Sequence, residues 1–282
     1  MESVSVIITC YNSANTIRRT INSVINQTYK DIEIIIVNDC STDNSLDVIK
    51  SIKDDRIKII NHELNKGAGL ARRTGLNNIT GSYTMFLDSD DYLKSDCIET
   101  LIKYTIEYDA DVVAPGYIPT KSNGDVMQIL LPDLNVQQGV NKYNHDSSDT
   151  KRFMNPMLIK SSIWDNVEYS SRRFIEDTPT LFKVLYYANK VVTVPYAGYY
   201  YTQNENSLIH SATSFKYKLY LALCAKDIYM FTKDKEMFQD TKPLCVLRLR
   251  ELFNNDYSVD DYNQYKDECT ELLFFISELK LF

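Results

Sequence analysis

The chain has 282 residues, of which 44% are hydrophobic and 24% are charged, with a formal net charge of −7 and an isoelectric point near 5.1. This length accommodates one large α/β domain, or one domain with a smaller appendage. The acidic balance argues against general nucleic-acid binding, which needs a basic face, and against a polybasic membrane patch.

Membrane and export signals are not evident in the sequence. No stretch approaches the roughly 18–20 apolar residues of a membrane span. The first residues, MESVSVIITCYN, enter a strand pattern without a basic segment or a small-residue cleavage site. The six cysteines are scattered without a C-x-x-C pair, which indicates reduced thiols. We expect a cytoplasmic protein without a transmembrane segment, and peripheral contact with the inner face of the membrane stays open.

The first 115 residues alternate between two patterns. Short apolar, β-branched runs predict strands, and apolar residues spaced three or four apart predict helices between them. The expected strands cover residues 4–9, 32–37, 56–60, 82–87 and 110–114, and the expected helices follow Ser13, follow NDCSTDNS, cover residues 68–78 and follow Ser95. This order predicts an α/β fold with a mostly parallel, Rossmann-like sheet flanked by helices.

Beyond residue 115 the pattern changes. The segment SNGD at residues 122–125 predicts a hairpin turn. A helix is expected over residues 178–189 and a strand over residues 191–195. From residue 214 onward the signals are mostly helical, so the chain is predicted to end in a helical segment.

These signals suggest two domains. The first is expected to cover residues 1–210, with a nucleotide-binding half over 1–115 and an acceptor half over 116–210. The second is a helical extension over residues 211–282. The sequence leaves open whether these helices form an oligomer.

Polar residues follow three of the expected strands. In open α/β sheets, ligands bind beyond the carboxyl ends of the strands. Tyr11, Asp39 and the cluster Asp88 to Asp91 each stand at such an end. The sequence therefore predicts a binding site along one rim of the sheet.

The segment DSDD at residues 88–91 places three carboxylates in four positions directly after an apolar run. Like charges this close raise one another's pKa. Carboxylates in D-x-D spacing project to one side of an extended chain, where Mn²⁺ or Mg²⁺ can offset the repulsion and bridge phosphate oxygens. The alternative is a surface turn whose aspartates cap a helix, although Ser95 already offers the next cap.

The segment GAGLARRTG at residues 67–75 begins like a dinucleotide fingerprint. Its third glycine is replaced by Arg72, and the first strand-to-helix turn, TCYNS, contains no glycine. NAD or FAD binding is therefore not expected. An arginine at this rim suits an anion such as a diphosphate, whereas a solvated helix face is the alternative for Arg72 and Arg73.

Three further residues are weaker candidates. Asp39 ends a strand, where a carboxylate can accept a hydrogen bond from a nucleobase imide. The alternative for this segment is helix capping by Ser41, Thr42 or Asp43, for which Asp39 stands too early. Asp177, in FIEDTP, stabilises a helix start or acts as a general base held apart from the metal. His210 lies in a predicted loop, where it completes the metal site or is simply solvated.

Taken in order, these stretches resemble inverting glycosyltransferases of family 2, which have the GT-A fold. The matching pieces are VSVIITCYNSANTIRRTINSVINQTY, IEIIIVNDCSTDNS, NKGAGLARRTGL and GSYTMFLDSDDYL, and more loosely FIEDTPTLF and YYYTQNENSL. The match is strong over about the first 115 residues and weaker over residues 150–210. The ordered set of motifs carries this resemblance, whereas DSDD alone would not.

The resemblance assigns donor-binding roles by position. It implies that Thr9 and Tyr11 line the nucleotide pocket, with Tyr11 against the base. It places Asp39 on the uracil or ribose, Arg72 near the diphosphate, and Asp88 near the ribose or donor sugar.

The resemblance also assigns the reactive groups. Asp90, the second aspartate of D-x-D, is implied to bind Mn²⁺ or Mg²⁺, and Asp177 is implied to be the catalytic base. Asp91 is left as a structural cap. The family often has asparagine where Arg73 stands, which would place an extra positive charge near the donor or on the surface.

The expected function is metal-dependent, inverting transfer of a hexose or N-acetylhexosamine from a UDP-sugar to an acceptor hydroxyl, in surface-glycan or polysaccharide biosynthesis. The acceptor is a glycan, a lipid-linked glycan or a protein. One alternative is a non-catalytic protein that binds nucleotide sugars or glycans on the same fold. Another is a sugar nucleotidyltransferase, which generally needs a basic, glycine-rich phosphate loop near the N-terminus.

Overall fold

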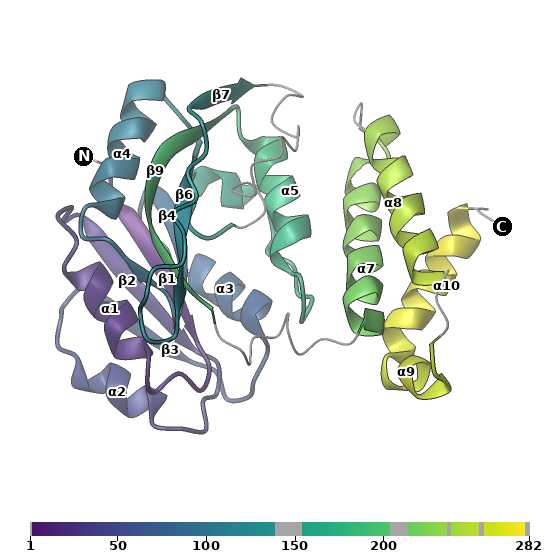
Figure 1. The fold of residues 1–282 in the computed structure, drawn as a ribbon, viewed down its shortest axis with the longest axis horizontal. Helices are drawn as coiled ribbons and strands as arrows, with labels where there is room; N and C mark the ends of the chain where they lie inside the picture. Colours follow the sequence, from purple (N-terminus) through teal and green to yellow (C-terminus); the bar gives the residue numbers. More distant parts are fainter. Residues whose placement is uncertain (1, 139–153, 204–213, 236–237, 254–256, 280–282) are drawn as a thin grey trace. The chain divides into compact units, whose positions relative to one another are not determined.

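The computed structural model describes residues 2–138, 154–203, 214–235, 238–253 and 257–279. The chain divides into two compact units (Figure 1). The first comprises Met1–Arg173 and Thr180–Asn204, and the second comprises Phe174–Pro179 and Glu205–Phe282. The domain boundary expected at residue 210 lies outside the described residues.

A single nine-stranded sheet organises the first unit, in the order β3-β2-β1-β4-β8-β6-β9-β5, with β7 paired to β9. Its strands are β1 Val4–Cys10, β2 Ile32–Asn38, β3 Ile57–Asn61, β4 Tyr83–Asp88, β5 Tyr92–Leu93, β6 Val112–Lys121, β7 Asn135–Gln138, β8 Leu158–Lys160 and β9 Lys190–Gln203. The first four strands in this order are mutually parallel. Because β2 and β4 lie on opposite sides of β1, the carboxyl ends of β1 and β4 form a topological switch point.

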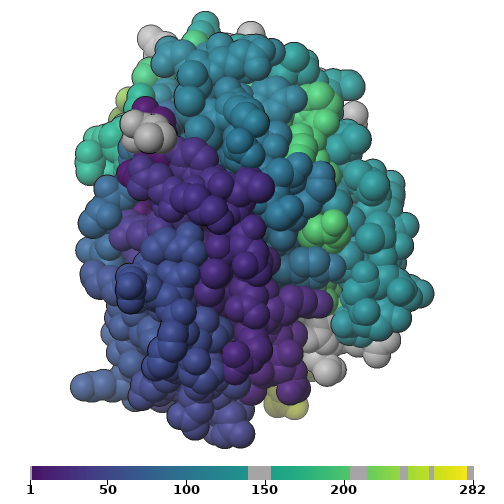
Figure 2. All heavy atoms as spheres, turned by 90° about the vertical axis from the view of Figure 1, so that its left-hand side faces the viewer, coloured from purple at the N-terminus to yellow at the C-terminus, as the bar shows by residue number. Residues whose placement is uncertain are grey.

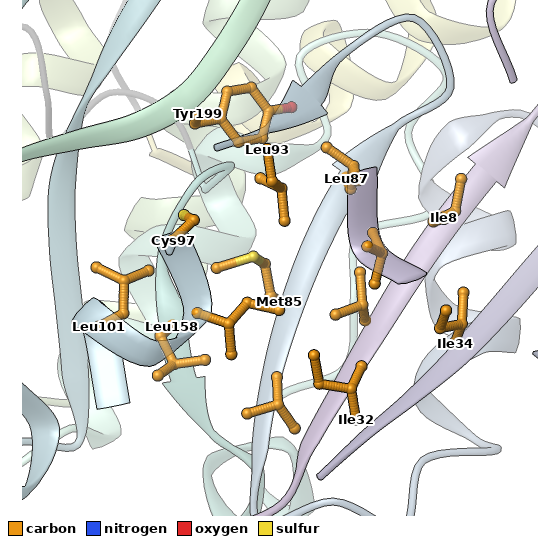
Figure 3. Packing of buried hydrophobic residues seen from close by; sticks show 14 of the residues in the cluster. Ile8, Ile32, Ile34, Met85, Leu87, Leu93, Cys97, Leu101, Leu158 and Tyr199 are labelled. Atoms are coloured by element: carbon orange, nitrogen blue, oxygen red, sulfur yellow. The ribbon is translucent and has the colours of Figure 1, made fainter. Parts of the chain in front are cut away.

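Helices cover both faces of the sheet, as expected for a parallel sheet with apolar strands. They are α1 Ile17–Ile25, α2 Ser45–Ser51, α3 Ala68–Leu76, α4 Cys97–Tyr108 and α5 Asp177–Tyr187. One buried layer packs Ile8 and Ile34 against α1 and α4 (Figure 3). The opposite layer packs Ile7 and Ile35 against α3 and α5.

The surface over the first of these layers is seen in Figure 2. Segments of the first half of the chain, coloured purple to blue, cover much of this face, and teal segments lie beside them. The binding site predicted from the sequence lies at the edge of the sheet, on the loops that follow β1, β2 and β4.

The sequence predicted most of these elements correctly, including the α/β class, the flanking helices and the hairpin at residues 122–125. In that hairpin, Lys121 N–H donates to Asp125 O at 2.9 Å, and Gly124 has a φ of 91°. The helix expected to be capped by Ser95 instead begins at Cys97, with Asp96 at the N-cap. The expected strand over residues 191–195 extends into the 14-residue strand β9.

The second unit is helical, as the sequence predicted. Its described helices are α7 Ser214–Thr232, α8 Phe238–Phe253, α9 Val259–Gln264 and α10 Lys266–Leu279. A separate apolar core joins α7, α8 and α10 through buried side chains that include Leu219, Leu249 and Phe275. Among the helices described, none combines the length and the apolar character needed to cross a membrane.

Candidate active site

The sheet brings the predicted rim residues to one edge. Parallel pairing sets Thr9 beside Asp88. Asp39 N–H donates to Cys10 O at 2.8 Å, so the ends of β1 and β2 are also joined. Tyr11 follows β1 and is 49% exposed. An exposed aromatic ring therefore lies on the same rim as two carboxylates that follow neighbouring strands.

Arg72 connects α3 to the end of β4. Its Nη2 donates to Asp88 Oδ1 at 2.7 Å, and its side chain is 8% exposed, while that of Asp88 is 36% exposed. The guanidinium also lies over the Tyr169 ring, 5.6 Å from the centroid. Arg72 is thus a nearly buried cation whose partner carboxylate is open to solvent on one side.

Arg73, the next residue, has a different environment. It forms an ion pair with Glu168, whose side chain is 72% exposed. The pair of arginines in the sequence therefore separates into one that reaches the DSDD segment and one that reaches a surface carboxylate.

The DSDD turn is held through its backbone by α1 and β9. Arg19 Nη2 and Thr202 Oγ1 each donate to the carbonyl oxygen of Asp90 at 2.6 Å. The Thr20 hydroxyl lies 2.9 Å from Ser89 O and 2.7 Å from Asp91 O. Because the carbonyl groups are fixed in this way, the side chains of the turn project from a defined backbone.

Asp91 is the anchor of this turn. It is buried, and its carboxylate accepts hydrogen bonds from the Tyr199 hydroxyl at 2.5 Å and from Thr202 N–H at 2.7 Å. Burial raises the pKa of Asp91, and the neighbouring charges of Asp90 and Asp88 add to this shift. Asp91 is structural, but it fastens the turn to β9 and does not cap a helix as the sequence had suggested.

Asp90 is the carboxylate best suited to a cation. Burial, and after it the nearby charge of Asp88, raises the pKa of Asp90 to about 6. A bound divalent cation would offset both costs. Within the described part of the chain, no three or more His, Cys, Asp or Glu side chains gather as a metal site. His210 lies outside the described residues.

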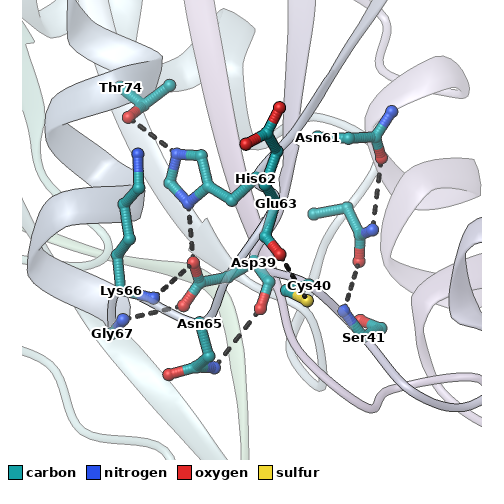
Figure 4. Close-up of polar contacts among 11 residues, drawn as sticks. Asp39, Cys40, Ser41, Asn61, His62, Glu63, Asn65, Lys66, Gly67 and Thr74 are labelled. Carbon is teal, nitrogen blue, oxygen red and sulfur yellow. Dashed lines mark hydrogen bonds and ion pairs between the residues drawn. The ribbon is translucent and has the colours of Figure 1, made fainter.

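Asp39 is buried within a hydrogen-bond network that the sequence did not reveal (Figure 4). Its Oδ1 accepts from Lys66 N–H at 2.9 Å and lies 2.6 Å from His62 Nδ1, and its Oδ2 accepts from Gly67 N–H at 2.8 Å. Because a carboxylate has about four acceptor positions, Oδ2 retains capacity for one more donor. The one available signal was that His62 follows β3 as Asp39 follows β2.

Asp177 is the first residue of α5 and belongs to the second compact unit. Asp177 follows Ile175, which has a φ of 55°. The rim residues thus lie in the first unit, whereas this predicted base lies in the second.

Comparison with known proteins agrees with this fold. The family described as Glycosyl transferase family 2 matches residues 5–162. GlyG of Streptococcus pneumoniae is 29% identical over 306 residues, covering 98% of this chain and 97% of the relative. GlyA of the same organism is 34% identical over 219 residues, covering 73% of this chain and 31% of GlyA.

Two further similarities complete the comparison. WfaP of Escherichia coli, a UDP-Glc:alpha-D-GlcNAc-diphosphoundecaprenol beta-1,3-glucosyltransferase, is 48% identical over 104 residues, covering 37% of this chain and 41% of WfaP. The crystal structure of S. aureus TarS 1-349 with UDP-GlcNAc has a TM-score of 0.73 at 21% identity, covering 94% of this chain and 79% of that one.

The sheet, its flanking helices and the TarS likeness define the GT-A type of fold. The chain belongs to glycosyl transferase family 2 and is an enzyme of the glycosyltransferase class. The resemblance inferred from the ordered motifs is thereby confirmed.

Proposed function

We propose that this enzyme is a metal-dependent, inverting glycosyltransferase that moves a hexose or N-acetylhexosamine from a UDP-sugar to an acceptor hydroxyl in surface-glycan or polysaccharide biosynthesis. The observation that carries this proposal is the Arg72–Asp88 pair beside Asp90 at the switch point of the sheet. UDP-sugars are named for the related proteins TarS and WfaP, which supports UDP as the donor nucleotide.

The rim offers matching groups for each part of a UDP-sugar. The exposed Tyr11 ring would stack on the uracil, with Thr9 lining the same pocket. Asp39 Oδ2 would accept from the uracil N3–H through its remaining acceptor position. Asp88 would contact the ribose or the donor sugar, and Arg72 would neutralise the diphosphate.

Asp90, with Asp88 adjacent, would hold Mn²⁺ or Mg²⁺. These residues fit such an ion because both are oxygen donors, and burial together with the charge of Asp88 raises the pKa of Asp90. When bound, the metal supplies Lewis-acid stabilisation of charge on the leaving diphosphate. Arg72 adds a fixed positive charge on the same side. His210 stays a predicted further ligand.

Asp177 would act as the general base. It takes the proton from the acceptor hydroxyl as that oxygen forms a bond to the anomeric carbon. The bond from this carbon to the diphosphate oxygen breaks, and its electron pair leaves with UDP. A single displacement from the opposite face inverts the configuration. The acceptor would be a glycan, a lipid-linked glycan or a protein.

A donor screen tests the proposal. The protein is incubated with Mn²⁺ and UDP-, GDP- and dTDP-sugars, and the released nucleotide is measured with and without chelator. We expect UDP release from a UDP-sugar, its loss on chelation, and a matching mass increase on an acceptor. Release of pyrophosphate would indicate a nucleotidyltransferase, and binding without turnover of any donor would contradict transfer.

Asp90→Ala gives an independent check of the metal site. Calorimetry with UDP should show metal-dependent binding for the native chain and none for the variant. An unchanged metal dependence in the variant would show that Asp90 is not the ligand.

A further inference from the structure

We infer that His62 is a positioning residue that joins the Asp39 carboxylate to helix α3 and thereby fixes Arg72 for binding of the nucleoside diphosphate. This inference rests on the proposed function, because it names a residue that prepares the same donor site. His62 itself is not among the predicted donor contacts.

Both ring nitrogens of His62 are engaged. Nδ1 lies 2.6 Å from Asp39 Oδ1, and Nε2 lies 2.9 Å from the Thr74 hydroxyl (Figure 4). The His62 side chain is 5% exposed. Because a carboxylate only accepts, the Nδ1–H group must be the donor in the first bond. A buried imidazole with two defined partners acts as a rigid strut between them.

The strands place this strut next to the rim. In the parallel pairing of β2 and β3, Asn38 lies beside Asn61. His62 N–H then donates to Asn38 O at 2.9 Å, which brings the residue after β3 against Asp39, the residue after β2. The ring therefore reaches Asp39 from the adjacent strand end, and its other edge meets α3.

Helix α3 is held on both sides of Arg72. Before the helix, the amides of Lys66 and Gly67 donate to Asp39 at 2.9 and 2.8 Å. Near its end, Thr74 bonds His62, which itself bonds Asp39. Arg72 lies between these two attachments and donates to Asp88 at 2.7 Å.

The packing of α3 leaves it little freedom to settle elsewhere. A Cβ atom on Gly75 would stand 2.4 Å from Ile7 Cγ2, so the helix lies directly on β1. A helix this close to the sheet cannot slide without a clash. Loss of the His62 strut would therefore not move α3 along the sheet, and its effect would be local, on the Thr74 end of the helix and on the Asp39 carboxylate.

The two bonds of His62 can be tested separately. His62→Asn keeps an amide donor within reach of Asp39 but loses Thr74, and Thr74→Val removes only the hydroxyl. His62→Leu removes both bonds. Thr105→Val is the matched control, because Thr105 is buried in α4 and its hydroxyl donates to a carbonyl of the same helix, Leu101 O, at 3.0 Å.

Calorimetry with UDP and Mn²⁺ measures the effect of each change on affinity. We expect UDP affinity to fall about tenfold in His62→Leu. This factor corresponds to the loss of one hydrogen bond to a charged group, here the Asp39 carboxylate. His62→Asn should stay within about threefold of the native chain, and Thr105→Val should bind normally. Normal binding by folded His62→Leu would overturn the inference.

A double-mutant cycle distinguishes positioning from general damage. In an Asp39→Asn background, adding His62→Leu should change UDP affinity by less than about twofold, because His62 acts through Asp39. An undiminished tenfold effect in that background would contradict the proposed route. If Asp39→Asn does not fold, the cycle is run with Thr74→Val, where His62→Leu still removes the bond to Asp39, so a loss close to tenfold is expected and its disappearance would contradict the route through Asp39.

Hydrogen exchange of residues 62–76 gives a readout that needs no nucleotide. We expect exchange in this segment to be at least about tenfold faster in His62→Leu, with α4 unchanged. Unchanged exchange in this segment would show that His62 does not hold α3 in place. If the native chain binds no UDP while exchange rises as expected, the proposed function fails and the structural role of His62 stands.

Discussion

The Tyr199 hydroxyl donates to the buried carboxylate of Asp91 across 2.5 Å, although the two residues are 108 positions apart in the chain. Asp91 directly follows Asp90, the proposed metal ligand. The bond therefore ties the acidic turn after β4 to strand β9, and the geometry of the site depends on a residue far outside the nucleotide-binding half.

Tyr199→Phe removes this donor and keeps the ring. Because the bond lies in the interior and its acceptor is a carboxylate, we expect the free energy of unfolding to fall by about 1–3 kcal/mol. Urea unfolding followed by circular dichroism would measure it. The matched control is Tyr196→Phe, since Tyr196 donates to Asp96 at 2.7 Å and the Asp96 side chain is 40% exposed. An equal loss in both variants would show that burial of the Asp91 bond has no special role.

Asp90→Asn should stabilise the metal-free protein near neutral pH. The pKa of Asp90 is raised from 3.8 to about 6 in the fold. The folded state therefore favours the protonated carboxyl. This preference contributes fully to the free energy of unfolding below pH 3.8, and the contribution is lost as pH rises through 6. Asparagine avoids this loss. At pH 7.5 we therefore expect the free energy of unfolding of Asp90→Asn to exceed that of the native chain by on the order of 1–3 kcal/mol.

Urea unfolding in chelator at pH 7.5 and at pH 3.5 checks this prediction. The gain should vanish at the lower pH, where the native carboxyl is protonated in both states. Exposed Asp55 offers the control Asp55→Asn, which should change little at either pH. If the native chain were more stable than Asp90→Asn at pH 7.5 without metal, the charged Asp90 carboxylate would not be destabilising in the fold.

Asp177→Asn should separate binding from chemistry. A general base contributes roughly 10²- to 10⁴-fold to the rate, and we expect a loss of that size in kcat. UDP affinity should stay within about twofold, because the predicted role of Asp177 concerns the acceptor. Glu176→Gln, which alters the adjacent acid, is the control and should keep transfer activity. Full activity of Asp177→Asn would exclude it as the base.

Arg72→Ala should weaken UDP binding by about 10- to 100-fold and leave uridine binding nearly unchanged, because the guanidinium is proposed to neutralise the diphosphate. Titration calorimetry with both ligands separates these effects. Arg73→Ala serves as the control, since Arg73 pairs with the exposed Glu168. Equal losses for UDP and uridine would indicate a general disturbance of α3.

Much of the fold was predictable because it depends on local patterns. The apolar run expected over residues 4–9 became β1 (Val4–Cys10), and that over 82–87 became β4 (Tyr83–Asp88). The rim followed from these strands, since the residue after a parallel strand must lie at the carboxyl edge. The structure indeed sets Arg72 against Asp88, two residues chosen from the sequence as donor contacts.

What could not be predicted depends on pairing between distant segments. Strand β8 has three residues, too few for a pattern, and it pairs with β4 and β6 in antiparallel fashion. Asp91 reads as a capping residue until Tyr199 is brought beside it. His62 carries no motif, and only the register of β3 on β2 shows that it faces Asp39.

The attachment of the acidic turn to β9 also bears on how such enzymes can be recombined. Thr202 and Tyr199, which hold the backbone of Asp90 and the carboxylate of Asp91, belong to the acceptor half of the sequence. A chimera that joins this donor half to the acceptor half of another transferase inherits a foreign strand at that position. The chimera would keep the acidic turn in place only if the incoming strand supplied an equivalent hydroxyl and phenol, or if the junction were moved beyond Gln203.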